Sequence, residues 1–489
     1  MNLASQLQHH ALTRPDHPAV ISISQVIDYA TLYASSHDLA QALQRDPRIG
    51  RRVGLYCSDP VALAIGFHAC LLAGVSAMIL DPTWPAEKLK TTLTQFGSPK
   101  VLTDQPGEAS VTELGHTALG VRKVSDPSHA LADLATQAGS DSELLLIFTS
   151  GSTGSPKAVV RTRHSWEQSI SRCAGILGAS EDSTTLVPGP LAHGLGLYAL
   201  VESVALGGTL VAPGRWQAGH VRRLLQSTSC NRLVAVPSLV RLLLQQIPLQ
   251  RLSGLRHVVT GGEALSLDLA QQILQLSKDV DCIEYFGSSE HSLIAYRQRS
   301  LEEAEESPFI GTLFDGVRAH LHAQNGTDGT GRLMIRSAFN AIGYDPQGSG
   351  QLERCEEATG IGDIARLLPG QRIQILGRGG EMMNINGNNV YPAEITRALE
   401  AAGLRQSLVL AHRLAHGKTV LTAYVQLALH QPLPDPSSVL QVLREILPVY
   451  KIPHDVVFLP SWPLTASGKC DIQTLPAPTT SGLRKLRLR

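Results

Sequence analysis

A loop rich in serine, threonine and glycine carries the residues best suited to chemistry. It follows an apolar run of strand length at residues 143–147 and ends at Lys157. Glycines let backbone N–H groups turn toward an anion, hydroxyls add donors, and the lysine adds positive charge. The spacing is not that of a Walker loop, because only two residues separate Gly154 from Lys157. The loop is either a polyphosphate site or a polar surface turn, and its candidate ligands are Thr149, Ser150, Gly151, Ser152, Thr153, Gly154 and Lys157.

The same loop resembles the signature of the adenylate-forming (AMP-binding) superfamily. That family contains acyl- and aryl-CoA synthetases, nonribosomal-peptide adenylation domains and beetle luciferases. Six further segments resemble other family motifs and occur in the family's order: residues 80–85, 285–290, 362–364, 377–378, 386–395 and 463–469. The resemblance runs from about residue 10 to about residue 471 and is closest to the acyl/aryl-CoA ligase branch.

The resemblance implies an enzyme with a two-step reaction, an AMP-forming acid–thiol ligase. A carboxylate attacks the α-phosphate of ATP and releases pyrophosphate, and a thiol then displaces AMP from the acyl-adenylate. The first step needs two anions brought into line and their charge offset. The implied cofactors are ATP, Mg²⁺ and CoA, or the phosphopantetheine of a carrier protein. Glu290 would bind Mg²⁺, a hard cation suited to carboxylate and phosphate oxygens.

The family motifs assign further roles by resemblance. Around the nucleotide, Phe286 would stack on adenine, Gly287 would lie beside it, and Ser289 would keep a hydroxyl near the α-phosphate. Asp363 would accept hydrogen bonds from the ribose hydroxyls, with Arg378 beside the same ribose.

The C-terminal motifs assign the catalytic lysine and a hinge. Lys469 would bridge the incoming carboxylate and the α-phosphate. Gly387 would lie near the tunnel for the thiol. Gly380 stands where relatives usually have Asp or Lys at the hinge, and Asn384 stands where many relatives have lysine. Neither departure removes a group that the first half-reaction needs.

The segment at residues 189–197 indicates which class of acid is activated. It resembles the P-L-x-H-x-x-G segment of acyl- and aryl-CoA ligases, and it lacks the acidic residue with which amino-acid-activating relatives hold an ammonium group. His193 would line the acyl or thiol side, although a lone histidine is often structural. Gly261 and Gly262 would leave room for the acyl group. We therefore expect an aliphatic or aromatic carboxylic acid.

The thiol acceptor is left open between CoA and a separate carrier protein, because no carrier segment follows Lys469. A stand-alone adenylation enzyme that loads such a carrier is the first alternative. A non-catalytic nucleotide-binding protein is an alternative of another class, and the joint presence of Lys469, Glu290 and Asp363 argues against it.

Composition excludes several classes of function. Lys plus Arg and Asp plus Glu both number 42, so no general basic field indicates a nucleic-acid partner. Seven dispersed cysteines without a C-x-x-C pair indicate reduced thiols in a cytoplasmic protein. The N-terminus does not resemble a signal peptide, and no long uncharged apolar run predicts stable membrane insertion.

The elements that must position these residues alternate between strands and helices, so the predicted class is α/β. Residues 52–56 and 256–260 read as strands, and 60–72, 266–276 and 392–402 as helices. The predicted architecture is a large N-terminal AMP-binding domain of several subdomains (1–377), a hinge (378–380) and a small mobile α+β domain with the catalytic lysine (381–475). A basic tail (476–489) is predicted to be mobile.

Overall fold

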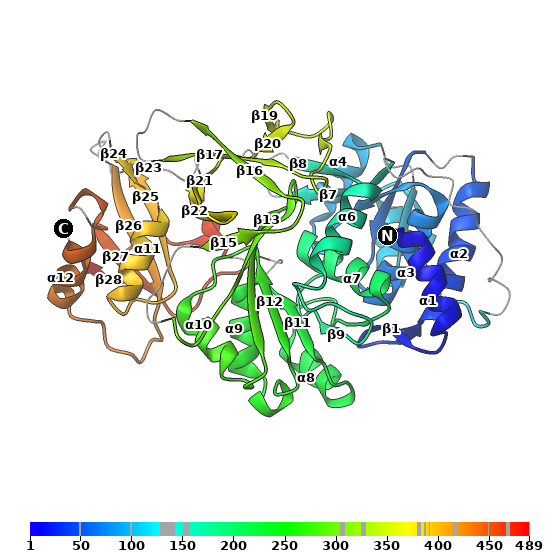
Figure 1. Cartoon of the computed structure of the whole chain (residues 1–489), viewed down its shortest axis with the longest axis horizontal. Coiled ribbons are helices and arrows are strands. Elements are labelled where there is room, and N and C mark those ends of the chain that lie inside the picture. The colour runs from blue at the N-terminus through cyan, green and yellow to red at the C-terminus, as the bar shows by residue number, and fades with distance from the viewer. Residues whose placement is uncertain are drawn as a thin grey trace.

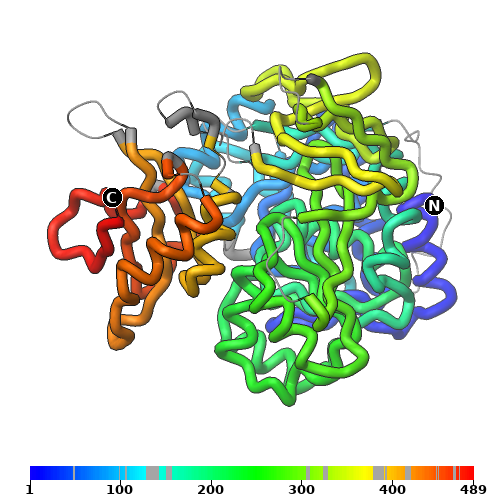
Figure 2. Tube along the Cα trace, turned by 60° about the vertical axis from the view of Figure 1, so that its left-hand side comes forward, coloured from blue at the N-terminus to red at the C-terminus, as the bar shows by residue number. Residues whose placement is uncertain are grey.

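The protein divides into a large α/β body and a smaller body at the C-terminal end (Figure 1). The structure is a computed structural model, and the residues that it describes are 1–47, 50–97, 100–127, 142–149, 157–303, 309–323, 329–378, 383–385, 388–390, 392–413, 419–447, 449–465 and 470–488. The N- and C-termini lie on opposite sides of the molecule in both views (Figures 1 and 2).

The largest sheet of the described residues has the strand order β19-β20-β17-β21-β22-β15-β14-β13-β12-β11-β9-β10-β1-β2, with β16 paired to β17. Its parallel part comprises β1 (Pro18–Ile21), β10 (Thr209–Val211), β9 (Thr184–Leu186), β11 (Arg232–Ala235), β12 (His257–Gly261) and β13 (Asp281–Ser288). The remaining strands are β2 (Val26–Asp28), β14 (Ser292–Gln298), β15 (Ile310–Leu313), β16 (Arg318–Ala323), β17 (Thr330–Arg336), β19 (Glu353–Cys355), β20 (Ala358–Gly360), β21 (Asp363–Leu368) and β22 (Arg372–Arg378).

A second sheet carries the serine- and glycine-rich loop. Its order is β18 (Gly343–Tyr344), β8 (Lys157–Thr162), β7 (Glu143–Thr149), β4 (Ser76–Ile79), β3 (Arg52–Tyr56), β5 (Lys100–Thr103) and β6 (Thr117–Gly120). The strands from β7 to β6 are parallel, and helices on both faces explain why their sequences are nearly continuous apolar runs. β7 and β8 form an antiparallel pair on either side of the loop.

Helices cover both sheets. α3 (Pro60–Ala73) is apolar all round and almost wholly buried, as expected of a helix packed on every side. Figure 1 shows α8, α9 and α10 beside β11 and β12. No helix in the described ranges is both long and apolar enough to cross a membrane. The other helices of the large body are α1 (Leu3–Thr13), α2 (Tyr29–Arg45), α4 (Ala86–Gln95), α5 (Gln105–Glu113), α6 (Arg163–Cys173), α7 (Gly194–Leu206), α8 (Ala218–Ser227), α9 (Pro237–Gln246), the 3₁₀ turn η1 (Leu249–Arg251) and α10 (Leu267–Leu274).

The smaller body has its own sheet and its own hydrophobic core, which draws on residues between 390 and 488. Its sheet has the order β25 (Ser407–Arg413), β26 (Thr419–Gln426), β27 (Asp455–Leu459) and β28 (Arg484–Arg487). α11 (Pro392–Ala401), α12 (Pro436–Ile446), the hairpin β23 (Met383–Ile385) and β24 (Asn388–Val390), and the turns η2 (Val449–Lys451) and η3 (Ile472–Thr474) complete it. Arg405 forms an ion pair with Asp268 at the start of α10, so the two bodies touch.

The α/β class with a large and a small part is confirmed, and the strands and helices predicted from the sequence lie where expected, within about two residues. The prediction of a mobile basic tail is wrong for residues 484–488. β28 pairs with β27, and Leu486 and Leu488 are each 6% exposed in the core of the small body. Two buried leucines alternate with basic residues, as in an edge strand with one buried face. The prediction considered only the basic residues and therefore missed this strand.

Candidate active site

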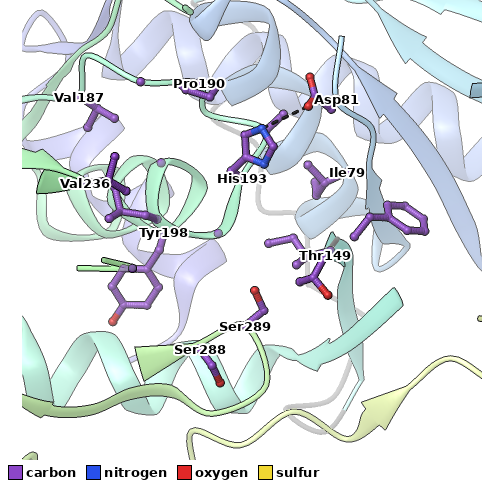
Figure 3. A pocket seen from close by; sticks show the side chains of 18 of the residues that line it. Ile79, Asp81, Thr149, Val187, Pro190, His193, Tyr198, Val236, Ser288 and Ser289 are labelled. Atoms are coloured by element: carbon purple, nitrogen blue, oxygen red, sulfur yellow. Dashed lines mark ion pairs between the residues drawn. The ribbon is translucent and has the colours of Figure 1, made fainter. Parts of the chain in front are cut away.

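A cavity of about 490 Å³ opens where strands of both sheets end at their carboxyl sides (Figure 3). Five family-like segments reach its wall: Asp81 after β4, Thr149 at the end of β7, His193 before α7, Ser289 after β13, and Thr465 from the small body. The carboxyl ends of parallel strands are the usual place for ligands in α/β folds. The described parts of five family-like motifs therefore meet at one cavity.

The serine- and glycine-rich loop is anchored at one edge of this cavity. Thr149 and Lys157 are cross-strand partners in the β7–β8 pair, so the two ends of the loop lie side by side. The Nζ atom of Lys157 lies 5.3 Å from the centre of the Tyr344 ring. Ser150, Gly151, Ser152, Thr153 and Gly154 lie outside the described residues.

The turn between β13 and β14 presents Ser289 to the cavity. The hairpin closes at the pair Ser288 and Ser292, and Gly287 is needed just before it. A β-carbon at Gly287 would lie 2.2 Å from the carbonyl oxygen of Ser292, so the strands approach too closely there for a side chain.

Glu290, in the same turn, is held by a tyrosine from another strand. The residue is 6% exposed, and its Oε1 accepts a hydrogen bond of 2.7 Å from the Tyr344 hydroxyl. Tyr344 belongs to β18, which pairs with β8 directly after Lys157. One tyrosine thus connects the ring contact of Lys157 with the carboxylate of Glu290.

Arg161 on β8 is hydrogen-bonded to the same turn. The arginine is 2% exposed and lines the cavity. Its Nη1 donates to the carbonyl of Ser289 at 2.9 Å and its Nη2 donates to the carbonyl of Phe339. Burial lowers the pKa of the guanidinium to about 10, with the charge of Glu290 acting in the opposite direction. The side chain therefore stays protonated at neutral pH and places a positive charge beneath Ser289.

His193 and Asp81 form a pair in the cavity wall (Figure 3). His193 Nε2 lies 3.2 Å from Asp81 Oδ2, and the carboxylate also accepts hydrogen bonds from the backbone and hydroxyl of Thr83. Burial alone would raise the pKa of Asp81, but His193 and Thr83 together lower it below its ordinary value. The pair is an ion pair whenever the imidazole is protonated.

The two glycines assigned to the acyl pocket behave differently. Gly262 lines the cavity, whereas Gly261 does not. A β-carbon on Gly261 would lie 2.3 Å from Cζ of Tyr285, its register partner on the neighbouring strand. The ring of Tyr285 thus lies over Gly261, and the role of Gly261 in the acyl pocket stays a prediction.

The residues assigned to adenine and ribose lie on neighbouring strands. Asp363 on β21 is 7% exposed and is the cross-strand partner of Arg378 on β22. Phe286 packs against Phe309 with ring centres 5.9 Å apart. Phe286, Asp363 and Glu290 do not form part of the cavity wall itself.

Several assigned residues fall outside the described residues, namely Gly380, Gly387 and Lys469. Thr465, from the same motif as Lys469, reaches the cavity, so this segment of the small body faces the site. No cluster of three or more His, Cys, Asp or Glu side chains in the described ranges could hold a metal by itself. All seven cysteines are free thiols, and burial raises the pKa of Cys470 to about 11.

Sequence reasoning missed Tyr344, Arg161 and Asp81 as parts of the site. Asp81 belongs to the family-like segment 80–85, which could have marked it as a site residue, but nothing in the sequence predicts its contact with His193. Arg161 also carried a signal, since a charged residue interrupts the apolar run of β8. Tyr344 carried none.

Comparison with known proteins agrees with this geometry. The profile of the family described as "AMP-binding enzyme" matches residues 7–345. The chain is 26% identical to a putative long chain fatty acid-CoA ligase of Staphylococcus haemolyticus, over 97% of this chain and 98% of that protein. It is 25% identical to part of gramicidin S synthase 2 of Brevibacillus brevis, covering 96% of this chain but 11% of that protein.

Solved structures share the fold. ATP-bound MatB from Rhodopseudomonas palustris superimposes with a TM-score of 0.81 at 21% identity, over 96% of this chain and 97% of that one. The o-succinylbenzoate CoA synthetase MenE from Bacillus subtilis, in complex with its acyl-adenylate, gives 0.77 at 24% identity, over 95% and 96%. With the family profile covering well over half of the sequence and the motifs meeting at one cavity, the chain belongs to the AMP-binding enzyme family and is an AMP-forming ligase of the acyl-CoA synthetase type.

Proposed function

We propose that the protein activates an aliphatic or aromatic carboxylic acid with ATP and Mg²⁺ and transfers the acyl group to CoA. The observation that carries this proposal is the cavity at which Thr149, Ser289, His193 and Thr465 meet. It brings the end of a phosphate-type loop, a hydroxyl, an imidazole and a segment of the small body to one place. Adenylation requires such convergence, because most of its catalysis is the positioning of two anions.

In the proposed first half-reaction a carboxylate oxygen attacks the α-phosphorus, and the bond to the β-phosphate breaks to release pyrophosphate. Thr149 and Lys157 hold the β- and γ-phosphates together with the loop between them. Ser289 donates to the α-phosphate, and the buried charge of Arg161 behind it favours anions at that point. Lys469 bridges the carboxylate and the α-phosphate.

The residues present fit Mg²⁺. This cation usually takes one or two protein carboxylates and completes its shell with phosphate oxygens and water. Glu290 supplies one buried carboxylate, oriented by Tyr344. Bound Mg²⁺ would neutralise phosphate charge. In the remainder of the nucleotide site, Phe286 and Gly287 hold the adenine, and Asp363 and Arg378 hold the ribose.

In the proposed second half-reaction a thiol attacks the acyl carbonyl, AMP leaves, and the thiol proton passes to solvent. His193 lines the acyl or thiol side and Gly387 the thiol tunnel. The small domain of residues 381–475 rotates against residues 1–377 about the segment 378–380, with Gly380 as the swivel. A separate carrier protein is the alternative acceptor.

The class of acid follows from the charges in the cavity wall. Its acidic member, Asp81, is already paired with His193, so it offers no free counter-ion to a substrate ammonium. Burying an unpaired ammonium would cost several kcal/mol, on the order of 10²-fold or more in rate. Acids without an α-amino group should therefore be strongly preferred.

The test is ATP–pyrophosphate exchange with a panel of acids and their α-amino analogues. Exchange that depends on both acid and Mg²⁺ supports the proposal. Release of ADP and phosphate in place of AMP and pyrophosphate would refute it, and efficient exchange with a common amino acid would overturn the substrate class. Adding CoA or a purified carrier protein to the enzyme-bound adenylate then identifies the acceptor.

A further inference from the structure

The ring of Tyr285 packs over a glycine on the neighbouring strand. Tyr285 lies on β13 directly beside Gly261 on β12, and its Cζ, Cε1 and Cε2 atoms are 2.3–2.7 Å from the place of a β-carbon on Gly261. Tyr285 is also part of the cavity wall. The ring therefore leans over the glycine, with the cavity on its other side.

Two further aromatic residues, Tyr198 and Trp166, also line the cavity. Tyr198 on α7 lines the cavity on the same side as Val236, opposite Thr149 (Figure 3). Its hydroxyl donates to Ser169 Oγ at 3.2 Å, and its ring meets Trp166 edge to face with centres 5.5 Å apart. Trp166 is 3% exposed and belongs to the main hydrophobic core. These fixed rings leave little freedom for the wall to open.

Behind the rings lies a buried ion pair. Glu202 follows Tyr198 by one helical turn on α7, and its Oε2 is 2.7 Å from Nη2 of Arg232 on β11. Both side chains are 1% exposed. The charges of both act on the Tyr285 hydroxyl. An alkyl chain that passed the rings would meet these buried charges and the packed hydrophobic core.

We propose that this cavity takes compact acids, short aliphatic chains or a single aromatic ring, and that Tyr285 sets the length limit. The inference rests on the proposed function and narrows its substrate class. It differs from the description of the Staphylococcus haemolyticus relative as a putative long chain fatty acid-CoA ligase.

The first test measures kcat/KM for pyrophosphate exchange with acetate, butyrate, hexanoate, benzoate, decanoate and palmitate. The expected optimum lies among butyrate, hexanoate and benzoate, with decanoate and palmitate much poorer. Palmitate or decanoate as the best acid would overturn the inference while leaving the proposed function intact.

Tyr285→Ala should move the optimum to longer acids. Each methylene that enters the vacated space should raise kcat/KM by up to about fourfold, the equivalent of about 0.8 kcal/mol. Tyr285→Phe, which keeps the ring, should retain the ranking of the parent protein. An unchanged ranking in Tyr285→Ala, with folding verified by its melting temperature, would contradict the role of the ring.

Gly261→Ala provides a matched control through a double-mutant cycle. In the parent protein the new methyl group pushes the ring into the cavity and should favour acetate over hexanoate. In the Tyr285→Ala background the same methyl group meets no ring and should leave the ranking unaltered. Equal effects of Gly261→Ala in both backgrounds would overturn the assigned packing.

Binding of non-reactive acyl-sulfamoyl adenosine analogues tests the length limit independently of the proposed ligase function. If no acid supports exchange, the proposed function fails, but the thermal shift given by hexanoyl and palmitoyl analogues still reports the cavity length. A larger shift with the hexanoyl analogue supports the length limit, and an equal or larger shift with the palmitoyl analogue refutes it.

Discussion

Replacing Tyr344 by phenylalanine should weaken the proposed Mg²⁺ site without touching the cavity. The change removes one oxygen, which donates a 2.7 Å hydrogen bond to the carboxylate of Glu290. Because Glu290 is 6% exposed, water replaces that bond poorly. A hydrogen bond to a charged group contributes about 1.5–3 kcal/mol, which corresponds to about 10- to 150-fold in kcat/KM.

The assay is pyrophosphate exchange at saturating ATP and acid, titrated with Mg²⁺. Tyr344→Phe should need more Mg²⁺ for half-maximal rate. Tyr29→Phe serves as the control, because its hydroxyl makes a bond of the same length to the backbone carbonyl of Gly208, far from Glu290. That variant should lose stability with no change in the Mg²⁺ requirement.

A double-mutant cycle with Glu290→Gln tests whether the tyrosine acts through the carboxylate. The effect of Tyr344→Phe should shrink to near zero when Glu290 is already neutral. An unchanged Mg²⁺ requirement in Tyr344→Phe, or a full effect that persists in the Glu290→Gln background, would refute the reasoning.

Four further predictions follow from the same structure. Lys469→Ala should slow adenylation by about 2.7–4 kcal/mol and spare thiolation of a supplied acyl-adenylate; single-turnover kinetics showing equal losses in both steps would exclude an alternating small domain. Asp81→Asn should lower the free energy of unfolding at neutral pH, because the fold lowers the pKa of Asp81. The stability that Asp81 contributes is present above its unfolded pKa and is lost as pH falls through its folded pKa, so the acid unfolding curves of variant and parent should converge at low pH. A difference in stability that persists at low pH would count against the ion pair with His193. Arg161→Lys should destabilise the protein by about 1–3 kcal/mol and reduce exchange, because one ammonium cannot bridge the carbonyls that the guanidinium joins; a melting temperature and rate equal to the parent's would show that the bridge is dispensable. Leu486→Ala should destabilise the small body by about 2–5 kcal/mol, whereas a free tail would show no change in melting temperature.

Much of the fold was predictable because it depends on local patterns. The apolar run that became β7, the proline that begins α11 and the glycine that follows it at residue 403 are signals carried by neighbouring residues. The family resemblance extended this to function, since motifs of the same type and order indicated an adenylate-forming enzyme. The prediction for residues 484–488 was wrong because it rested on the basic residues there. The burial of the two leucines among them depends on pairing with β27, which is distant in the sequence.

The pairings that define the site depend on the order of strands, which local patterns do not contain. Asp81 meets His193 because β4 and the loop before α7 end at the same cavity, and Tyr344 meets Glu290 because β18 pairs with β8. Gly261 illustrates the difference most clearly. A missing side chain indicates close approach, but only the register of β12 and β13 decides whether a substrate or the ring of Tyr285 occupies the space.

The sequence by itself thus determined the family and the type of reaction and predicted the groups that carry it, because reactive residue types and their local spacing are covalent properties of the chain. Tertiary structure decided which groups support one another and how large an acid can enter, because those depend on contacts between segments far apart in the chain. The charge of Arg161, the bond from Tyr344 and the limit set by Tyr285 all belong to this second class.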